Sequence, residues 1–112
     1  MEIISNIKSN VLMLSLKGDL IGEESGSNII EVVNSNMEFA TNGCAIDFSG
    51  VRYMNSSGLG VLITIHTKFK NKQGEVIIVN PSTQVNKLLS ITKLDTLFSS
   101  VETQEDAIQK LN

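Results

Sequence analysis

The sequence predicts a single α/β domain with a mixed, mostly parallel sheet of four to five strands and about four helices, in the order β-β-α-β-α-β-α-(β)-α. Two runs, "CAIDFS" (44–49) and "EVIIVN" (75–80), are short and almost entirely apolar, as is typical of central strands covered on both faces. Segments with helical periodicity lie between and after these runs. Parallel neighbouring strands must be joined by crossover connections, which are usually helices. With 112 residues, 41% of them hydrophobic, the chain suits one core and one domain over residues 1–112.

The N-terminal part of the chain is predicted to form a hairpin and then a helix. Residues 2–8 and 11–20 are expected to be strands that meet at Ser9 and Asn10. In the second strand, the leucines at 12, 14 and 16 would share one face, while Val11 and Met13 would lie on the other. Apolar residues then recur at helical spacing over 24–40, and "TNG" at 41–43 indicates where that helix stops.

The C-terminal part is predicted to hold three more helices. The second helix begins at "NSSG" (55–58) and ends near Gly74, and a third begins after Pro81 and Ser82. A short strand is possible over residues 97–101, and Thr103 with Asp106 resembles a capping box before a last amphipathic helix. The apolar stripe of the second helix is expected to consist of Leu59, Leu62, Ile63, His66 and Phe69.

Composition excludes several classes of function. Nine basic and twelve acidic residues give a net charge of −3 without a dense basic cluster, so nucleic acid is not an expected partner. No signal sequence and no 18-residue apolar run occurs, which predicts a cytoplasmic protein that does not insert into membranes. Cys44 is the only cysteine and is expected to be a buried strand residue. Asp47 is a lone carboxylate, and no His or Cys cluster suggests a metal or cofactor.

The Asn-Ser-Ser-Gly turn is the candidate functional site. It follows a predicted parallel strand, and ligands of open α/β sheets favour the carboxyl ends of such strands. Asn55 or Ser56 could cap the second helix, so an ordinary helix start with spare hydroxyls is one reading. The turn lacks the glycine and lysine pattern of nucleotide-binding loops. His66 would lie about 15 Å from Ser56 along the helix, so serine hydrolysis has no base and we predict no enzyme activity.

A serine at this turn could instead be a site of covalent modification by another protein. Phosphorylation would add about −1.5 to −2 charges at a helix N-terminus, where free N–H groups tolerate negative charge. The domain could then keep its fold while the surface around the turn changes.

The stretch "DFSGVRYMNSSGLGVL" resembles the signature of the anti-sigma factor antagonist family, the STAS domain, whose usual pattern is D-[LF]-S-x-V-x-[FY]-[MI]-D-S-[ST]-G-L-G. "LKGDL", "GEVIIVNPSTQVNKLLSITKLDTLF" and "ETQEDAIQKL" also fall where the family has counterparts, so the resemblance covers nearly the whole chain. It implies the STAS fold and a phosphoprotein that takes part in partner switching.

The resemblance further implies that the unphosphorylated protein sequesters an anti-sigma factor with serine kinase activity and so releases a sigma factor for transcription. By the motif, the phosphorylated residue is Ser56, with Ser57 as the alternative, and a metal-dependent serine phosphatase would restore it. The alternative from another class is a non-switching STAS subunit of a lipid-transport or signalling complex. Two positions depart from the family pattern, since Asn55 and Ile21 stand where acidic residues are usual.

A partner is predicted to dock over the start of the second helix and the loop 19–22. Glycine lacks a side chain and so permits close approach of another backbone. Replacing Gly58 or Gly60 with a bulky residue is therefore expected to weaken binding more than folding. Besides Ser56, the predicted contact residues are Asp19, Leu20, Ile21, Gly22, Asn55, Ser57, Gly58, Leu59 and Gly60.

Overall fold

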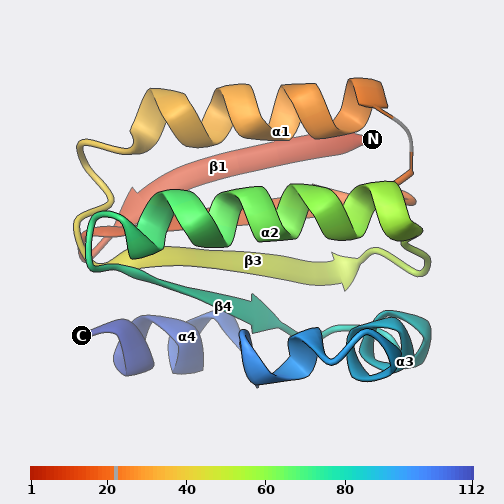
Figure 1. Cartoon of the computed structure of the whole chain (residues 1–112). Helices are drawn as coiled ribbons and strands as arrows, with labels where there is room; N and C mark the ends of the chain where they lie inside the picture. The colour runs from red at the N-terminus through yellow and green to blue at the C-terminus, as the bar shows by residue number, and fades with distance from the viewer. Residues whose placement is uncertain (22) are drawn as a thin grey trace.

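A five-stranded mixed sheet runs through the computed structural model, which describes residues 1–21 and 23–112 apart from the side chains of residues 23 and 24 (Figure 1). The strands lie in chain order. β1 (Glu2–Lys8) is antiparallel to β2 (Val11–Lys17), and β3 (Gly43–Gly50), β4 (Glu75–Val79) and β5 (Ser99–Val101) continue the sheet in parallel. The predicted mixed, mostly parallel sheet is confirmed, including the short last strand.

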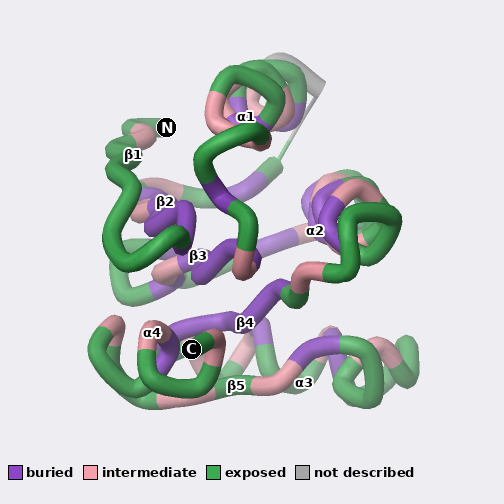
Figure 2. Tube along the Cα trace, turned by 90° about the vertical axis from the view of Figure 1, so that its left-hand side faces the viewer, coloured by how far each residue is buried: buried purple, intermediate pink, exposed green. Residues whose placement is uncertain are grey.

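Helices cover both faces of this sheet. α1 (Glu23–Asn36) and α2 (Ser56–Lys70) lie side by side on one face, and α4 (Gln104–Leu111) packs on the other (Figures 1 and 2). α3 (Thr83–Ile91) follows β4 and leads through a short 3-10 turn, η1 (Leu94–Thr96), to β5. The order of elements is the predicted one, except that η1 was not expected.

The hairpin shows why the core divides in two. Ser9 and Asn10 both have positive φ, 54° and 64°, which is the conformation of a tight two-residue turn. Strand alternation then sends Leu12, Leu14 and Leu16 into the larger cluster beneath α1 and α2. Val11 and Met13 point the other way, into a smaller cluster with Ala107 of α4. The faces predicted for this strand are confirmed.

Two helical expectations need correction. Ile63 was assigned to the apolar stripe of α2, but its side chain is 39% exposed, while Ile65 is fully buried. Each residue advances about 100° around a helix, so the face centred on Leu62, Ile65 and Phe69 leaves Ile63 outside. α1 also ends at Asn36 rather than near residue 40, because the amides of Phe39 and Ala40 close a turn onto the Asn36 carbonyl.

The second strand is shorter than predicted, which matters for the site. β2 ends at Lys17 instead of continuing to residue 20. Beyond it the chain follows the segment after β3: the Gly18 amide donates to the Gly50 carbonyl, and Leu20 forms an isolated parallel bridge with Met54. Residues 18–20 therefore lie alongside the turn that leads into α2.

Candidate functional site

The turn between β3 and α2 is held from one side by the segment after β2. The Leu20 amide donates to the Tyr53 carbonyl at 2.9 Å, and the Asn55 amide donates to the Leu20 carbonyl at 3.3 Å. Leu20 and Met54, the two bridge partners, are both fully buried. Their neighbours Ile21 and Tyr53 point outward, and each is 46% exposed. The pairing thus places two exposed apolar side chains beside the start of α2.

The beginning of α3 holds the same turn from the other side. The carboxamide of Gln84 binds both backbone groups of Met54: its Oε1 accepts from the Met54 N–H at 3.0 Å, and its Nε2 donates to the Met54 carbonyl at 3.1 Å. The Ser82 hydroxyl donates to the Arg52 carbonyl at 3.0 Å. With Leu20 on one side and Gln84 on the other, the backbone before Ser56 is fixed by hydrogen bonds.

Asn55 is the N-cap of α2. Its backbone is extended, with φ −104° and ψ −174°, and its Oδ1 accepts a hydrogen bond from the Gly58 N–H at 3.1 Å. The Leu59 amide donates to the Asn55 carbonyl, so the backbone hydrogen bonds of α2 begin at Asn55. Within the described part of the chain, no protein atom accepts a hydrogen bond from the amides of Ser56 and Ser57. Of the two capping candidates, the structure selects Asn55, and both serines are exposed.

The two glycines of the motif have different surroundings. A Cβ on Gly58 would lie 2.6 Å from the Leu20 carbonyl oxygen and 2.7 Å from Cγ of Met54. A Cβ on Gly60 would meet nothing within 4 Å. Gly58 is therefore needed for the close approach of α2 to Leu20, so a larger residue at this position is expected to affect folding as well as any binding. Gly60 stays available to a partner.

The structure brings together only part of the predicted contact set. Leu20, Gly58 and Leu59 are buried, because α2 packs on the Leu20 segment and Leu59 points into the core, so these three offer no side chain to a partner. Gly22 lies outside the described residues. Tyr53 was missed, although it occupies the aromatic position of the motif. The rest of the predicted set together with Tyr53, which we call the switch surface, comprises the exposed residues Asp19, Ile21, Tyr53, Ser56, Ser57 and Gly60 and the half-buried Asn55.

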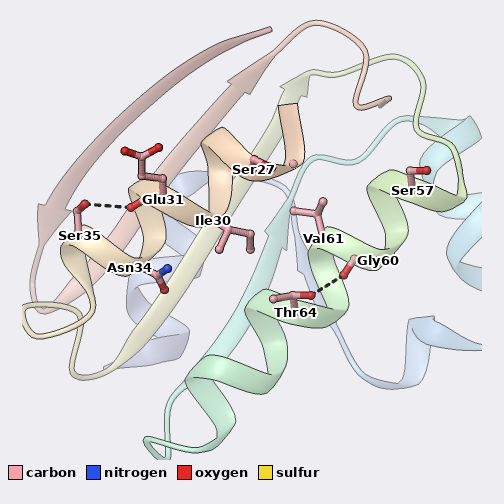
Figure 3. A pocket seen from close by; sticks show the side chains of 10 residues that line it. Ser27, Ile30, Glu31, Asn34, Ser35, Ser57, Gly60, Val61 and Thr64 are labelled. Atoms are coloured by element: carbon pink, nitrogen blue, oxygen red, sulfur yellow. Dashed lines mark hydrogen bonds between the residues drawn. The ribbon is translucent and has the colours of Figure 1, made fainter. Parts of the chain in front are cut away.

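A groove of about 930 Å³ continues from the switch surface between α1 and α2 (Figure 3). Ser57 and Gly60 line it near the start of α2, and the rest is lined by a mixture of polar and apolar residues of both helices: Gly26, Ser27, Ile30, Glu31, Asn34, Ser35, Val61 and Thr64. The helices approach each other closely at Gly26, where an added Cβ would lie 2.7 Å from Cγ2 of Val61. The groove was not predicted, since it depends on the packing of two helices separated by a strand.

The local electrostatics suit an added negative charge. The first turn of α2 contains no acidic residue, and Asn55 is neutral. The positive end of the helix dipole and the two free amides therefore face no nearby carboxylate on their own helix. A negative charge on the side chain of Ser56 or Ser57 would therefore interact favourably with this end of the helix.

Three other chemically notable residues have structural roles. Cys44 is fully buried, and burial raises its pKa far above the ordinary thiol value, which matches the expected inert strand residue. His66 packs edge-on against Phe98, with ring centroids 5.4 Å apart. Among the described residues it makes no hydrogen bond to Ser56.

Asp47 is not a free carboxylate. Partial burial raises its pKa, but hydrogen bonds from Ser49 and Gln104 outweigh this effect and leave the pKa below its usual value. The Ser49 amide donates to Oδ1 at 2.8 Å, and Nε2 of Gln104 donates to Oδ2 at 2.6 Å. Asp47 thereby ties β3 to the first residue of α4.

Two other kinds of site are absent from the described residues. No helix there is both long and apolar enough to cross a membrane. Over the same residues, no group of three or more His, Cys, Asp or Glu side chains is arranged to hold a metal ion.

A family model and several solved structures that resemble this chain point to the same family. Residues 2–107 match the STAS domain. A Thermotoga maritima protein, provisionally assigned as an anti-sigma factor antagonist, superposes with a TM-score of 0.86 at 23% identity, covering 97% of this chain and 93% of that one. An anti-sigma-factor antagonist (STAS) domain protein from Planctomyces limnophilus gives 0.83 at 20% identity, with 98% and 97% covered.

A third solved structure is the Bacillus cell fate determinant SpoIIAA in its phosphorylated form. It superposes with a TM-score of 0.77 at 19% identity, covering 99% of this chain and 100% of the other. At these identities the superpositions establish a shared fold.

Proposed function

The chain belongs to the STAS domain family, and on this basis we propose that it is an anti-sigma factor antagonist controlled by phosphorylation of Ser56. In the unphosphorylated state it binds an anti-sigma factor that is also a serine kinase, and so releases a sigma factor. The kinase ends this binding by phosphorylating Ser56, and a metal-dependent serine phosphatase restores it. These partners put the exchange in the cytoplasm, and the protein itself acts as a binding module without catalysis.

The observation that carries the proposal is the setting of Ser56. Its hydroxyl is exposed on the first residue of α2, directly after the Asn55 cap. The neighbouring amides of Ser56 and Ser57 have no acceptor in the described protein, so a phosphate would gain hydrogen bonds and a favourable dipole interaction. Phosphorylation should therefore leave the monomer folded.

The switch surface offers a binding site that such a charge would disturb. Ile21 and Tyr53 provide exposed apolar area beside Ser56, and tyrosine is among the residues that dominate interface energies. Gly60 permits close approach next to them. In the complex, a phosphate at Ser56 would have to lose water against the partner, and an uncompensated buried charge weakens binding by several kcal/mol.

Ser57 remains the alternative phosphorylation site. It is also exposed, and its side chain lies at the end of the groove between α1 and α2 (Figure 3). Ser56 is preferred because it occupies the phosphoserine position of the family motif.

A second function, a non-switching STAS subunit of a lipid-transport or signalling complex, is favoured by one feature. Asn55 and Ile21 replace the acidic residues that usually flank the site in the family. A kinase that recognises those acids would phosphorylate this chain less readily, while the fold and the switch surface would still serve a permanent partner.

An affinity pull-down from the native organism separates the two functions. With the wild-type protein as bait, the switch proposal expects recovery of an ATP-binding anti-sigma kinase, and Ser56→Asp bait should lose it. Recovery of transporter components by both baits equally would favour the non-switching subunit and contradict the switch.

A further inference from the structure

β1 forms an edge of the sheet whose outer side is open. In the described part of the chain its only strand neighbour is β2, and Figure 2 shows it at one side of the molecule. Its seven residues pair with β2 in an unbroken register, without a bulge or proline. The other edge, β5, has only three residues. Long regular edges are templates for pairing with another strand, and proteins usually shorten or interrupt them.

The hairpin turn determines which backbone groups of β1 are free. A two-residue turn closes with its flanking residues, here Lys8 and Val11, as a hydrogen-bonded pair. Alternation along an antiparallel ladder then turns the N–H and C=O groups of Ile3, Ser5 and Ile7 away from β2. Within the described residues, none of these three forms a backbone hydrogen bond outside the hairpin. The free edge thus presents three donor and acceptor pairs in regular spacing.

The sequence of β1, "EIISNIK", is complementary to itself when read in the opposite direction. If Ser5 of one copy lies opposite Ser5 of another, Ile3 lies opposite Ile7, and Glu2 lies opposite Lys8. We propose that β1 pairs antiparallel with β1 of a second copy of this chain about Ser5, which joins the two sheets into one.

Three features favour this register over its neighbours. Ile3, Ser5 and Ile7 all carry outward groups, so each pair can exchange both backbone hydrogen bonds. Both ends of the paired segment bring opposite charges together, and opposite charges in cross-strand pairs are stabilising while like charges are destabilising. A shift by two residues would set Lys8 opposite Ile4 or leave it unpaired, and would also reduce the number of backbone bonds.

Exposed apolar side chains on the edge would also be covered. Ile7 is 37% exposed and would face Ile3 of the second copy on the side of α1 and α2. Ile4 is 56% exposed on the α4 side, and its counterpart in the second copy would lie at the diagonal position, within reach of a long side chain. Seven residues span only about 24 Å, at about 3.4 Å each, so the interface is small and the dimer weak and concentration-dependent.

Sedimentation velocity of the full chain, from about 10 µM to about 1 mM, tests the proposal. The wild type is expected to form a dimer at the upper concentrations. Lys8→Glu and Glu2→Lys should each weaken association at least tenfold, because each sets like charges opposite one another. Mixing these two variants should restore a dimer, since every facing pair then has opposite charges. Lys87→Glu on α3, which changes the net charge as Lys8→Glu does, should behave as the wild type.

A cross-link tests the register itself. Ser5→Cys should oxidise to a covalent dimer under mild conditions, because residue 5 faces its own copy at about 5.5 Å between Cα atoms, a separation a disulfide can bridge. Asn6→Cys should not, since residue 6 faces residue 4. A wild type that stays monomeric throughout the range, a dimer insensitive to both charge variants, or equal cross-linking by both cysteines would overturn the proposal.

Discussion

The carboxamide of Gln84 binds both the N–H and the C=O of Met54, at 3.0 and 3.1 Å, across 30 residues of sequence. The side chain of Gln84 thus supplies the two hydrogen bonds that a neighbouring strand would supply to the Met54 backbone within a sheet. Met54 is fully buried and precedes Ser56 by two residues, so this contact fixes the position of the backbone from which α2 begins.

Gln84→Ala is expected to destabilise the fold by about 1–3 kcal/mol, because two partly buried backbone groups lose their partners. Chemical denaturation measures the change, with Asn86→Ala on the same helix as the control, since among the described residues the Asn86 side chain makes only a long exposed hydrogen bond of 3.5 Å to the Pro81 carbonyl. Similar stability of the two variants would show that the Gln84 contact does not hold the turn.

The two motif glycines are expected to separate folding from binding. Gly58→Ala should cost about 1–3 kcal/mol of folding free energy, because the new methyl group collides with the Leu20 carbonyl and Met54. Gly60→Ala should instead stabilise the helix by up to about 1 kcal/mol, since its Cβ enters open space. Thermal melts compare the two variants, and equal melting temperatures would contradict the packing described here.

A larger residue at Gly60 tests the switch surface. Gly60→Leu should fold like the wild type but bind the proposed anti-sigma partner at least tenfold more weakly, because the leucine would occupy the space needed for close approach. Calorimetric titration measures the affinity. Unchanged affinity would remove Gly60 from the proposed contact surface.

Asp47 predicts a pH dependence of stability. Its pKa is lower in the folded protein than in the unfolded chain, so its contribution is present above the ordinary aspartate pKa of about 4 and is lost as the pH falls through the folded value. Asp47→Asn should therefore flatten the loss of stability below about pH 4. Urea denaturation from neutral to acidic pH follows the effect. Asp95→Asn serves as control, since Asp95 is exposed in η1 and its side chain accepts no hydrogen bond from the described residues. Parallel pH profiles for wild type and Asp47→Asn would contradict this assignment.

Much of this fold could be predicted because its signals are local. The apolar runs over β3 and β4, the alternation of Leu12 and Met13, and the capping residues Asn55 and Thr103 each depend on a few neighbouring residues. The Thr103 hydroxyl accepts a hydrogen bond from the Asp106 N–H, as expected for the residue that caps the last helix. Such patterns identify elements and their inward faces without knowledge of the tertiary packing.

The parts that escaped prediction depend on distant partners. Nothing near Leu20 indicates that it will pair with Met54 instead of extending β2, and no local pattern links Gln84 to the same turn. The burial of Gly58 and the openness of Gly60 likewise follow from where Leu20 lies. The motif could therefore locate the candidate site, whereas the exposed part of that site became clear only from the packing around it.

The central proposal is that charge at Ser56 switches partner binding without unfolding the domain. Ser56→Asp should keep the wild-type stability or gain about 0.3–1 kcal/mol, because a carboxylate at a helix N-terminus interacts favourably with the dipole. Ser56→Ala should bind like the wild type but should not be switched off by the kinase.

Calorimetric titration of Ser56→Asp and Ser56→Ala against the isolated anti-sigma partner, together with thermal melts, tests this most directly. Ser100→Asp, which adds the same charge at an exposed position of β5, is the control. The account predicts that Ser56→Asp loses affinity by about two orders of magnitude or more while Ser100→Asp and Ser56→Ala retain it. A well-folded Ser56→Asp protein with unchanged affinity would contradict it.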